Sequence, residues 1–189
     1  MNAELIPSLR SELDDGEVVF LHGLESGPGG TKARWLKHHL GAITPELDTS
    51  VAIATWKREE RWDEAARLAA FATPLARARD VLAGARVAIG SSFGGAVLLQ
   101  LAWSGAWAGP CVYLAGAGVK LTPHRSLPRG SRAVLVHGRY DEVVPLADSR
   151  LLAGSPGCTT WLHEVPDGHR LTSVLDSGLL AAAILTGIG

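Results

Sequence analysis

The sequence predicts a three-layer α/β/α sandwich, an α/β fold built on a mainly parallel, six-stranded sheet. Short runs rich in β-branched and aromatic residues recur along the 189-residue chain, and segments with helical apolar spacing separate them. Several of these runs are apolar at every position, which is typical of strands covered on both faces. Hydrophobic residues make up 47% of the chain and charged residues 20%, as in a soluble globular protein. We therefore expect residues 1–189 to form a single domain, with residues 1–16 as an N-terminal extension.

The first half of the chain contains three of the six predicted strands. A run such as EVVFLH, followed by Gly23, is typical of a buried strand, whereas apolar residues three and four apart indicate helices. Pro74 lies inside the longest of these helices, where it is able to kink the axis. The predicted strands are Glu17–His22, Ser50–Thr55 and Arg86–Ile89, and the predicted helices are Thr31–Leu40, Arg61–Leu82 and Gly95–Trp103.

The second half repeats the alternation and completes the sheet. Its predicted strands are Cys111–Leu114, Arg132–His137 and Thr160–Val165, and its helices are Pro145–Leu152 and Thr172–Leu185. If these three strands lie side by side in chain order, Cys111 and Cys158 are two strand spacings apart, roughly 9–10 Å, which is too far for a disulfide. We expect two free thiols.

Charge and hydropathy argue against several classes of partner. The formal net charge is −1 and the basic residues are scattered, so neither a nucleic acid nor an anionic membrane is an expected partner. The segment Met1–Gly16 carries four acidic residues and lacks the apolar core of a secretory signal. No stretch reaches the roughly 20 apolar residues of a membrane span. A cytoplasmic location is expected, and the oligomeric state stays open.

The segment VAIGSSFGGA carries the most informative motif. It matches G-x-S-x-G with Ser92 at its centre, a predicted strand before it and a predicted helix after it. A sharp strand-to-helix turn needs small neighbours such as Gly90 and Gly94, and it lifts the central hydroxyl above the edge of the sheet. We interpret Ser92 as a nucleophile; the alternative is a plain Gly/Ser turn.

Two later loops supply the partners that a serine nucleophile requires. Asp141 follows the predicted strand that ends at His137, and His169 follows the last strand, within PDGHR. Active sites of open α/β sheets gather at the carboxyl ends of the strands. Each residue has a structural alternative, Asp141 as a helix N-cap and His169 as a polar loop residue. The chain order Ser–Asp–His favours a catalytic triad of Ser92, Asp141 and His169.

The remaining site predictions concern backbone amides and pocket walls. An oxyanion hole needs two converging N–H groups, for which Phe93, next to the serine, and Leu24, after the first strand, are the candidates. His22 is interpreted as a structural residue that holds this loop. Four residues in loops at the same edge are predicted to line a substrate pocket, with packing as the alternative: Glu25, Trp56, Tyr140 and Arg170.

The glycine-rich loop Gly23–Lys32 invites a rival interpretation as a phosphate-binding loop. That motif places Lys before Ser or Thr, in G-K-[ST], so that the ammonium reaches the phosphates. Here Thr31 precedes Lys32 and no Gly-Lys pair exists. The sequence therefore predicts no nucleotide cofactor, and the two cysteines lack the spacing of metal ligands.

Four segments of the chain, taken in order, resemble the motifs of a known superfamily. The segments FLHGLESGPGGTKARWL, VAIGSSFGGAVLLQLA, VLVHGRYDEVVPLADS and PDGHRLTSVL look like the oxyanion loop, nucleophile elbow, acid loop and histidine loop of α/β-hydrolases, most of all the small bacterial esterase-like members. The resemblance covers most of Glu17–Gly189. It implies ester or thioester hydrolysis through an acyl-serine, without metal or cofactor. Only Ala115–Gly130 stands where larger relatives insert a lid domain, and the two N-terminal strands of the full fold are missing.

Together these observations lead to a hypothesis with two alternatives. The hypothesis is a serine hydrolase without a lid that acts on a small-molecule ester. One alternative is a binding or regulatory protein that uses the same scaffold without turnover, because a fold by itself does not prove chemistry. The other is a peptidase or a C–C bond hydrolase that uses the same three residues.

Overall fold

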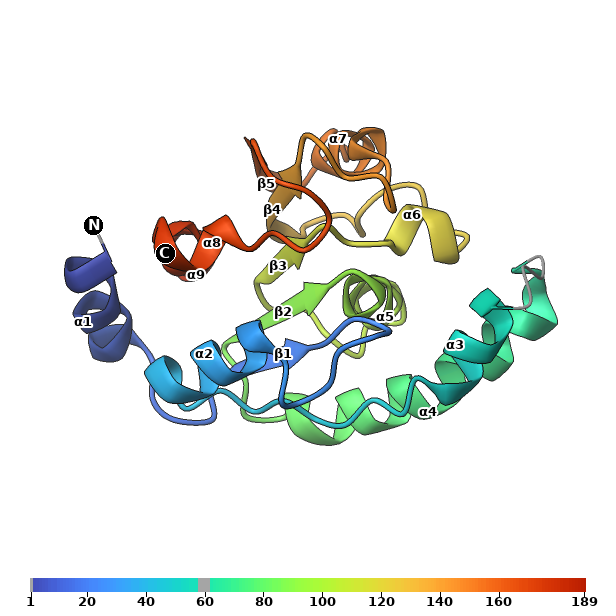
Figure 1. The fold of residues 1–189 in the computed structure, drawn as a ribbon, viewed down its shortest axis with the longest axis horizontal. Helices are drawn as coiled ribbons and strands as arrows, with labels where there is room; N and C mark the ends of the chain where they lie inside the picture. Colours follow the sequence, from blue (N-terminus) through green and yellow to red (C-terminus); the bar gives the residue numbers. More distant parts are fainter. Residues whose placement is uncertain (1, 58–61) are drawn as a thin grey trace.

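The computed structural model describes residues 2–57 and 62–189 and contains a five-stranded parallel sheet with strand order β1-β2-β3-β4-β5 (Figure 1). Each strand pairs in register with the next, for example Val18 with Val87 at the start of β1 and β2. The order β3-β4-β5 agrees with the expected arrangement of the last three strands, and both cysteines are free. The strands are β1 Val18–Leu21, β2 Val87–Ser91, β3 Cys111–Leu114, β4 Arg132–Gly138 and β5 Thr159–Val165.

Helices cover both faces of the sheet, which confirms the three-layer prediction. The alternation within β1 shows why: Val19 and Leu21 belong to one buried cluster, whereas Val18 and Phe20 belong to the other. The helices that contribute to the first cluster are α3 Ser50–Lys57, α4 Glu64–Leu82, α5 Phe93–Trp103, α6 Gly118–Leu121 and α7 Leu146–Ala153. Those that contribute to the second are α1 Asn2–Glu12, α2 Thr31–Leu40, α8 Ser173–Asp176 and α9 Leu179–Ile188.

One predicted strand is wrong, and the sheet therefore has five strands rather than six. Residues Ser50–Thr55 lie in helix α3, where Ala52 and Thr55 are buried and Val51 is 46% exposed. That spacing of three is helical, and the buried face packs against α4. A six-residue apolar run does not by itself distinguish a strand from a helix.

A sixth strand beside β1 would have to pair with the outer edge of β1. Ile43 already occupies that edge, because its N–H donates to Val18 O at 2.8 Å and its carbonyl accepts from Phe20 N at 2.9 Å. A single bridge thus satisfies the backbone groups that another strand would have used.

The structure differs from the sequence prediction at both ends of the chain, with a helix at the N-terminus and a broken helix at the C-terminus. The N-terminal extension forms α1, which packs against α9 and buries Leu9 and Leu13 in the second cluster. The predicted C-terminal helix is broken into α8 and α9 at Gly178, whose φ of +79° is a left-handed conformation that favours glycine. Arg61, the predicted start of the long helix, lies outside the described residues; α4 begins after Asp63, which caps Ala66 N at 2.9 Å.

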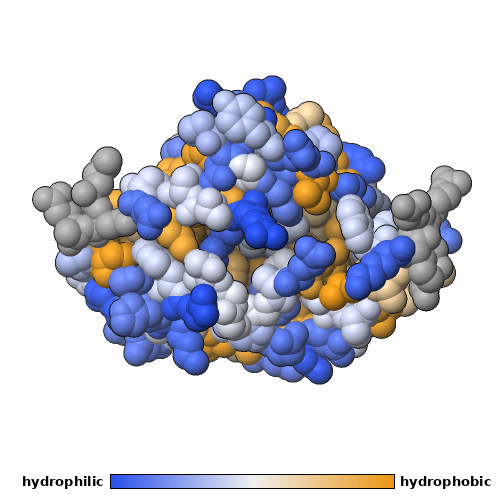
Figure 2. Space-filling view, viewed as in Figure 1, coloured by the Kyte–Doolittle hydropathy of each residue, from blue (hydrophilic) through white to orange (hydrophobic). Residues whose placement is uncertain are grey.

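Between β3 and β4, where a lid domain would be inserted, the chain forms only the one-turn helix α6 and loops. Figure 2 shows hydrophilic residues spread over one face of the molecule, with hydrophobic residues between them in small groups. Within residues 2–57 and 62–189, no helix combines the length and the apolar character needed to cross a bilayer.

Candidate active site

The three residues of the predicted triad lie at the carboxyl ends of three strands of the sheet. Ser92 follows β2, Asp141 follows β4 and His169 follows β5. Because all five strands are parallel, these ends meet at one edge of the sheet. Residues up to 77 positions apart in sequence are thereby brought together.

The turn between β2 and α5 holds Ser92 in an unusual backbone conformation. Its φ of 51° and ψ of −114° lie outside the regions that non-glycine residues ordinarily occupy, and such strain is found mainly at functional positions. Backbone packing imposes this conformation. A Cβ on Gly94 would lie 2.0 Å from Leu21 O, and one on Gly90 would lie 2.6 Å from Gly94 O. The small residues predicted on both sides of the serine are therefore required by sterics.

The three side chains form a continuous row of hydrogen bonds. Ser92 Oγ lies 2.9 Å from His169 Nε2, and His169 Nδ1 lies 2.8 Å from Asp141 Oδ2. Since an ionised carboxylate only accepts, Nδ1 carries the proton and Nε2 is free to accept the proton of the Ser92 hydroxyl. This is the arrangement in which an imidazole acts as a general base toward a hydroxyl.

Asp141 is fully buried as a side chain but keeps its charge. Burial by itself raises the pKa of this carboxyl, but hydrogen bonds from Val144 N, from His169 and from Val143 N outweigh it, and the pKa is lowered overall. Both backbone amides donate to Oδ1 at 2.8 Å. Asp141 does not cap α7, whose N-cap position is Pro145.

The loop after β1 presents the amide of Leu24. The His22 Nδ1–H donates to Gly23 O at 2.8 Å, while Leu47 N donates to His22 Nε2 at 3.2 Å. In a trans peptide the N–H points opposite to the C=O, so the Leu24 N–H faces away from His22. The loop also passes close to the nucleophile, because a Cβ on Gly23 would lie 3.4 Å from Ser92 Cβ. His22 thus has the structural role expected from the sequence.

The amide of Phe93 is oriented in the same way. The carbonyl of Ser92, which belongs to the same peptide group, accepts from Gly95 N at 3.0 Å and from Ala117 N at 2.9 Å. The Phe93 N–H therefore points away from these partners, outward from the start of α5. Among the described residues, neither Leu24 N nor Phe93 N has a protein acceptor.

Polar side chains hold the histidine loop in place. Asp167 accepts from Gly168 N at 2.7 Å and from Ser173 N at 2.8 Å. Lys32, at the start of α2, donates to Arg170 O and interacts electrostatically with Asp167. Burial lowers the pKa of Lys32, which the charge of Asp167 only partly offsets. Lys32, from the loop that superficially suggested phosphate binding, thus contacts the loop of His169.

The four predicted pocket residues are all exposed and lie around this edge. Tyr140 is 69% exposed, and its backbone N–H donates to Asp167 O at 3.0 Å. Trp56 was predicted in a loop but lies in helix α3, because Ser50–Lys57 is helical. It is 42% exposed, and the Lys120 ammonium lies 4.8 Å from its ring centroid. Glu25 and Arg170 are exposed neighbours of Leu24 and His169. Their contact with a substrate stays a prediction.

Sequence reasoning missed three side chains near this edge. Lys120 donates to Val143 O at 2.8 Å and so links Trp56 to the acid loop. Lys32 supports the histidine loop, and His137 lies 3.2 Å from Asp141. Only His137 had a usable signal, because it stands four residues before the acid at the end of a strand. The two lysines act through contacts between elements that sequence spacing does not reveal.

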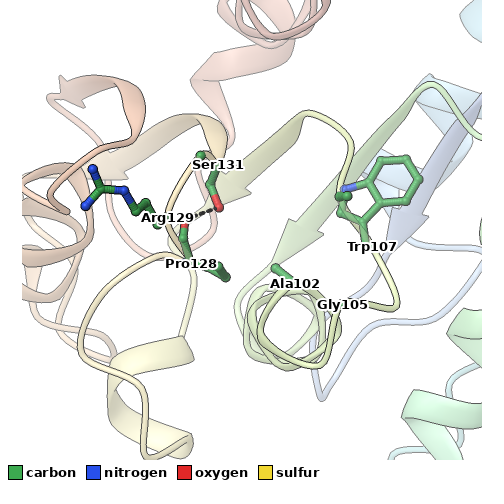
Figure 3. Close-up of a pocket in the computed structure, with 8 residues that line it drawn as sticks. Ala102, Gly105, Trp107, Pro128, Arg129 and Ser131 are labelled. Carbon is green, nitrogen blue, oxygen red and sulfur yellow. Dashed lines mark hydrogen bonds between the residues drawn. The ribbon is translucent and has the colours of Figure 1, made fainter.

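A separate hollow of about 220 Å³ lies at the amino ends of β3 and β4, away from the triad (Figure 3). Ala102, Gly105, Trp107 and the segment 128–131 line it, and the Arg129 guanidinium points away from its apolar wall. Across residues 2–57 and 62–189, no three His, Cys, Asp or Glu side chains are grouped as metal ligands would be.

Comparisons with known proteins agree with this architecture. Neither family models nor curated protein sequences match the chain. A solved structure described as a hydrolase of the alpha/beta superfamily, from Xanthomonas campestris pv. campestris, is 22% identical over 89% of this chain and 96% of that one, with a TM-score of 0.65.

Two further solved structures are similar. Dienelactone hydrolase from Anabaena variabilis is 20% identical over 93% of this chain and 88% of its own, with a TM-score of 0.61. Esterase PE8 is 19% identical over 93% and 96%, with a TM-score of 0.58. At these identities the similarity shows a shared fold, and function has to be argued from the site.

Proposed function

We propose that this chain, which has the fold of the α/β-hydrolase superfamily, is a serine hydrolase. It would cleave small carboxylic esters or thioesters through an acyl-serine intermediate. One observation carries the proposal, namely the row of hydrogen bonds from Ser92 through His169 to Asp141. Ser92 Oγ lies 2.9 Å from His169 Nε2, and His169 Nδ1 lies 2.8 Å from Asp141 Oδ2. Ser92 also has a strained backbone conformation. A protein that only binds its ligand does not require this row.

In the first half-reaction Ser92 Oγ attacks the carbonyl carbon of the ester while His169 Nε2 takes the hydroxyl proton. The tetrahedral intermediate carries its negative charge on the former carbonyl oxygen, which the amides of Leu24 and Phe93 stabilise. Asp141 holds the imidazole in its tautomer and stabilises the imidazolium. The C–O or C–S bond then breaks, and the leaving group departs with the proton from His169.

In the second half-reaction water replaces the alcohol or thiol. His169 accepts a proton from the water as its oxygen attacks the acyl carbon, and a second oxyanion forms in the same place. When this intermediate collapses, the bond to Ser92 Oγ breaks, the serine regains its proton from His169, and the carboxylic acid leaves. The cycle consumes one water and needs no metal or cofactor.

The short segment between β3 and β4 supports a small substrate. Only α6 and its loops stand near the site there, and exposed side chains such as Trp56 and Tyr140 line the rim. An open rim leaves long acyl chains in water, so it offers them little apolar burial. We propose acetyl and butyryl esters as better substrates than long-chain ones.

The test is hydrolysis of p-nitrophenyl acetate by the purified chain and by Ser92→Ala. Loss of the nucleophile is expected to lower turnover by roughly 10⁴- to 10⁶-fold. Ser91→Ala is the matched control, since it removes a hydroxyl one residue earlier and is expected to retain activity. A fluorophosphonate probe is expected to label the wild type at Ser92 and to leave Ser92→Ala unlabelled.

Near-normal turnover by Ser92→Ala would show that another group performs the chemistry. A wild-type chain that is neither labelled nor active on any ester would favour the non-catalytic binding protein. Faster cleavage of peptide substrates than of esters would favour a peptidase, and clear preference for long-chain esters would contradict the open rim.

A further inference from the structure

We propose that His137, a second and fully buried histidine behind the triad, is a positioning residue that orients the carboxylate of Asp141 and shares its charge. This inference rests on the proposed function, because it assigns a role within the same site. His137 is the second last residue of β4, and its side chain has no exposed surface. It takes no part in the proton transfers derived above.

The surroundings of His137 determine which ring nitrogen carries the proton. Nε2 lies 3.0 Å from Val144 O and 3.2 Å from Asp141 Oδ2, and both of these oxygens only accept. An unprotonated Nε2 would face two acceptors without a proton between them. Nδ1 lies 2.7 Å from Ser149 Oγ, whose hydroxyl is able to donate. The neutral ring therefore carries its proton on Nε2, with Nδ1 as the acceptor.

This tautomer reaches Asp141 by two routes. The Nε2–H donates to the carbonyl of Val144, a residue whose own N–H donates to Asp141 Oδ1 at 2.8 Å. The same N–H is also close to Oδ2, the oxygen that His169 uses. His137 thus holds Val144, the residue whose N–H binds one carboxylate oxygen, and places a positive dipole beside the other oxygen.

Because His137 and His169 both lie beside Asp141 Oδ2, a change at one histidine alters the charge that the other meets. Negative charge on Asp141 Oδ2 that interacts with the His137 N–H is less available to the imidazolium of His169. Removing the His137 N–H leaves His169 facing a more strongly negative oxygen, so His169 takes up a proton more readily. The acid limb of the pH–rate profile, which reports the protonation of the general base, then moves to higher pH.

Other charged side chains also face His137 and Asp141, and they contribute to the pH dependence expected of the site. Asp148 from α7 and Glu164 from β5 interact electrostatically with His137. Glu164 is paired with Arg150 at 2.7 Å and lies 3.9 Å from Arg139. None of these side chains changes in the variants proposed below.

The experiment compares His137→Phe with His137→Gln, using p-nitrophenyl acetate hydrolysis across pH. Phenylalanine keeps a buried ring without the N–H, and kcat is expected to fall about tenfold, with KM changed less than about twofold. The acid limb of kcat/KM is expected to move to higher pH. Glutamine restores an N–H close to the position of Nε2, so most of kcat and the wild-type acid limb should return.

A matched control separates positioning from general loosening of the fold. Ser155 is buried just after α7, and its Oγ accepts from Leu127 N and donates to Leu152 O, both at 2.7 Å, so its hydrogen bonds involve no triad residue. Ser155→Ala is expected to lower the unfolding temperature and leave the acid limb in place. If His137→Phe lowers kcat with an acid limb that stays or moves to lower pH, or if Gln rescues nothing, the proposal is wrong.

A measurement on the wild type keeps the proposal testable even if a variant fails to fold. In the ¹⁵N spectrum of histidine-labelled protein, His137 is expected to carry a proton on Nε2, where Val144 O and Asp141 Oδ2 accept it. A proton found on Nδ1 alone would overturn the proposed role. Failure of the proposed function is distinguishable, because it would appear in Ser92→Ala and in probe labelling, before any change at His137.

Discussion

The nucleophile turn and the histidine loop both have close backbone packing, but they differ in how far side-chain hydrogen bonds add to it. Around Ser92 the backbone itself leaves no freedom, because Gly94 lies so close to Leu21 O that even a methyl group does not fit. Around His169 there is also a close backbone contact, because a Cβ on Gly138 would lie 2.3 Å from Asp167 O, and the side chains of Asp167 and Lys32 add hydrogen bonds to it. The helix after Ser92 is buried, whereas Arg170 beside His169 is exposed.

We therefore expect the Ser92 end and the His169 end of the proton-transfer row to tolerate substitutions differently. Steric exclusion is nearly all-or-none, because a clash with backbone cannot relax without moving a strand. Polar contacts at a partly exposed loop can be lost one at a time, each for about 1 kcal/mol. We therefore expect substitutions in the turn to affect folding and substitutions around the loop to affect turnover.

The largest effect is expected for Gly94→Ala. The added methyl group would lie 2.0 Å from Leu21 O and 2.7 Å from His22 O, so β1 and α5 would have to separate. We expect destabilisation of at least about 3 kcal/mol, or no folded protein, as measured by urea unfolding. Gly84→Ala is the control, because no other atom lies within 4 Å of the place its methyl group would take. A stable, active Gly94→Ala would contradict the steric account of the turn.

A smaller effect is expected for Asp167→Ala in the histidine loop. The variant loses the acceptors of Gly168 N and Ser173 N, so kcat should fall roughly tenfold while stability falls only about 2 kcal/mol. The matched control is Asp80→Ala, which removes an exposed carboxylate on α4. If Asp167→Ala costs as much stability as Gly94→Ala, the contrast between the two regions disappears.

The same carboxylate predicts a pH dependence of stability. Burial tends to raise the pKa of Asp167, but hydrogen bonds from Ser173 and Gly168 and the charge of Lys32 lower it overall. Its ionised form therefore stabilises the fold above the unfolded pKa of about 3.9, and this contribution is lost as the pH falls through the lower folded value. Below about pH 4 the unfolding free energy of Asp167→Ala should fall less steeply than that of the wild type.

The smallest effect is expected for Lys32→Met. Folding lowers the pKa of this ammonium mainly through burial, so its charge opposes folding and its removal should leave the unfolding temperature unchanged or raised. Turnover should fall about threefold, because Arg170 O loses its donor. Lys37→Met, on the exposed side of α2, should change neither quantity. Unchanged turnover in Lys32→Met would show that the loop needs no support from α2.

The pattern of apolar residues was sufficient to predict the strands of the sheet. The runs that became β1–β4 are apolar at most positions, and five of six predicted strands are present. Ser50–Thr55 has the same composition but folds as α3, because the edge of β1 is occupied by Ile43 and the face of α4 is available. The helix α1 was not predicted at all, since its burial depends on α9.

For the site, the sequence by itself determined which groups the chemistry has available. G-x-S-x-G after a strand, followed by an acid and a histidine in later strand–helix loops, is local information, and the parallel fold brings such loops to one edge. Ser92, His169 and Asp141 lie there within hydrogen-bonding distance.

The way in which these groups are held depends on contacts between elements that are distant in the chain. The tautomer of His137, the contact of Lys32 with the histidine loop and the position of Lys120 over Trp56 all join elements that are distant in the chain. Local periodicity reports which face of an element is buried, because burial follows from apolar spacing. It carries no information about which polar atom of another element lies opposite, since that depends on how the packed helices and strands meet.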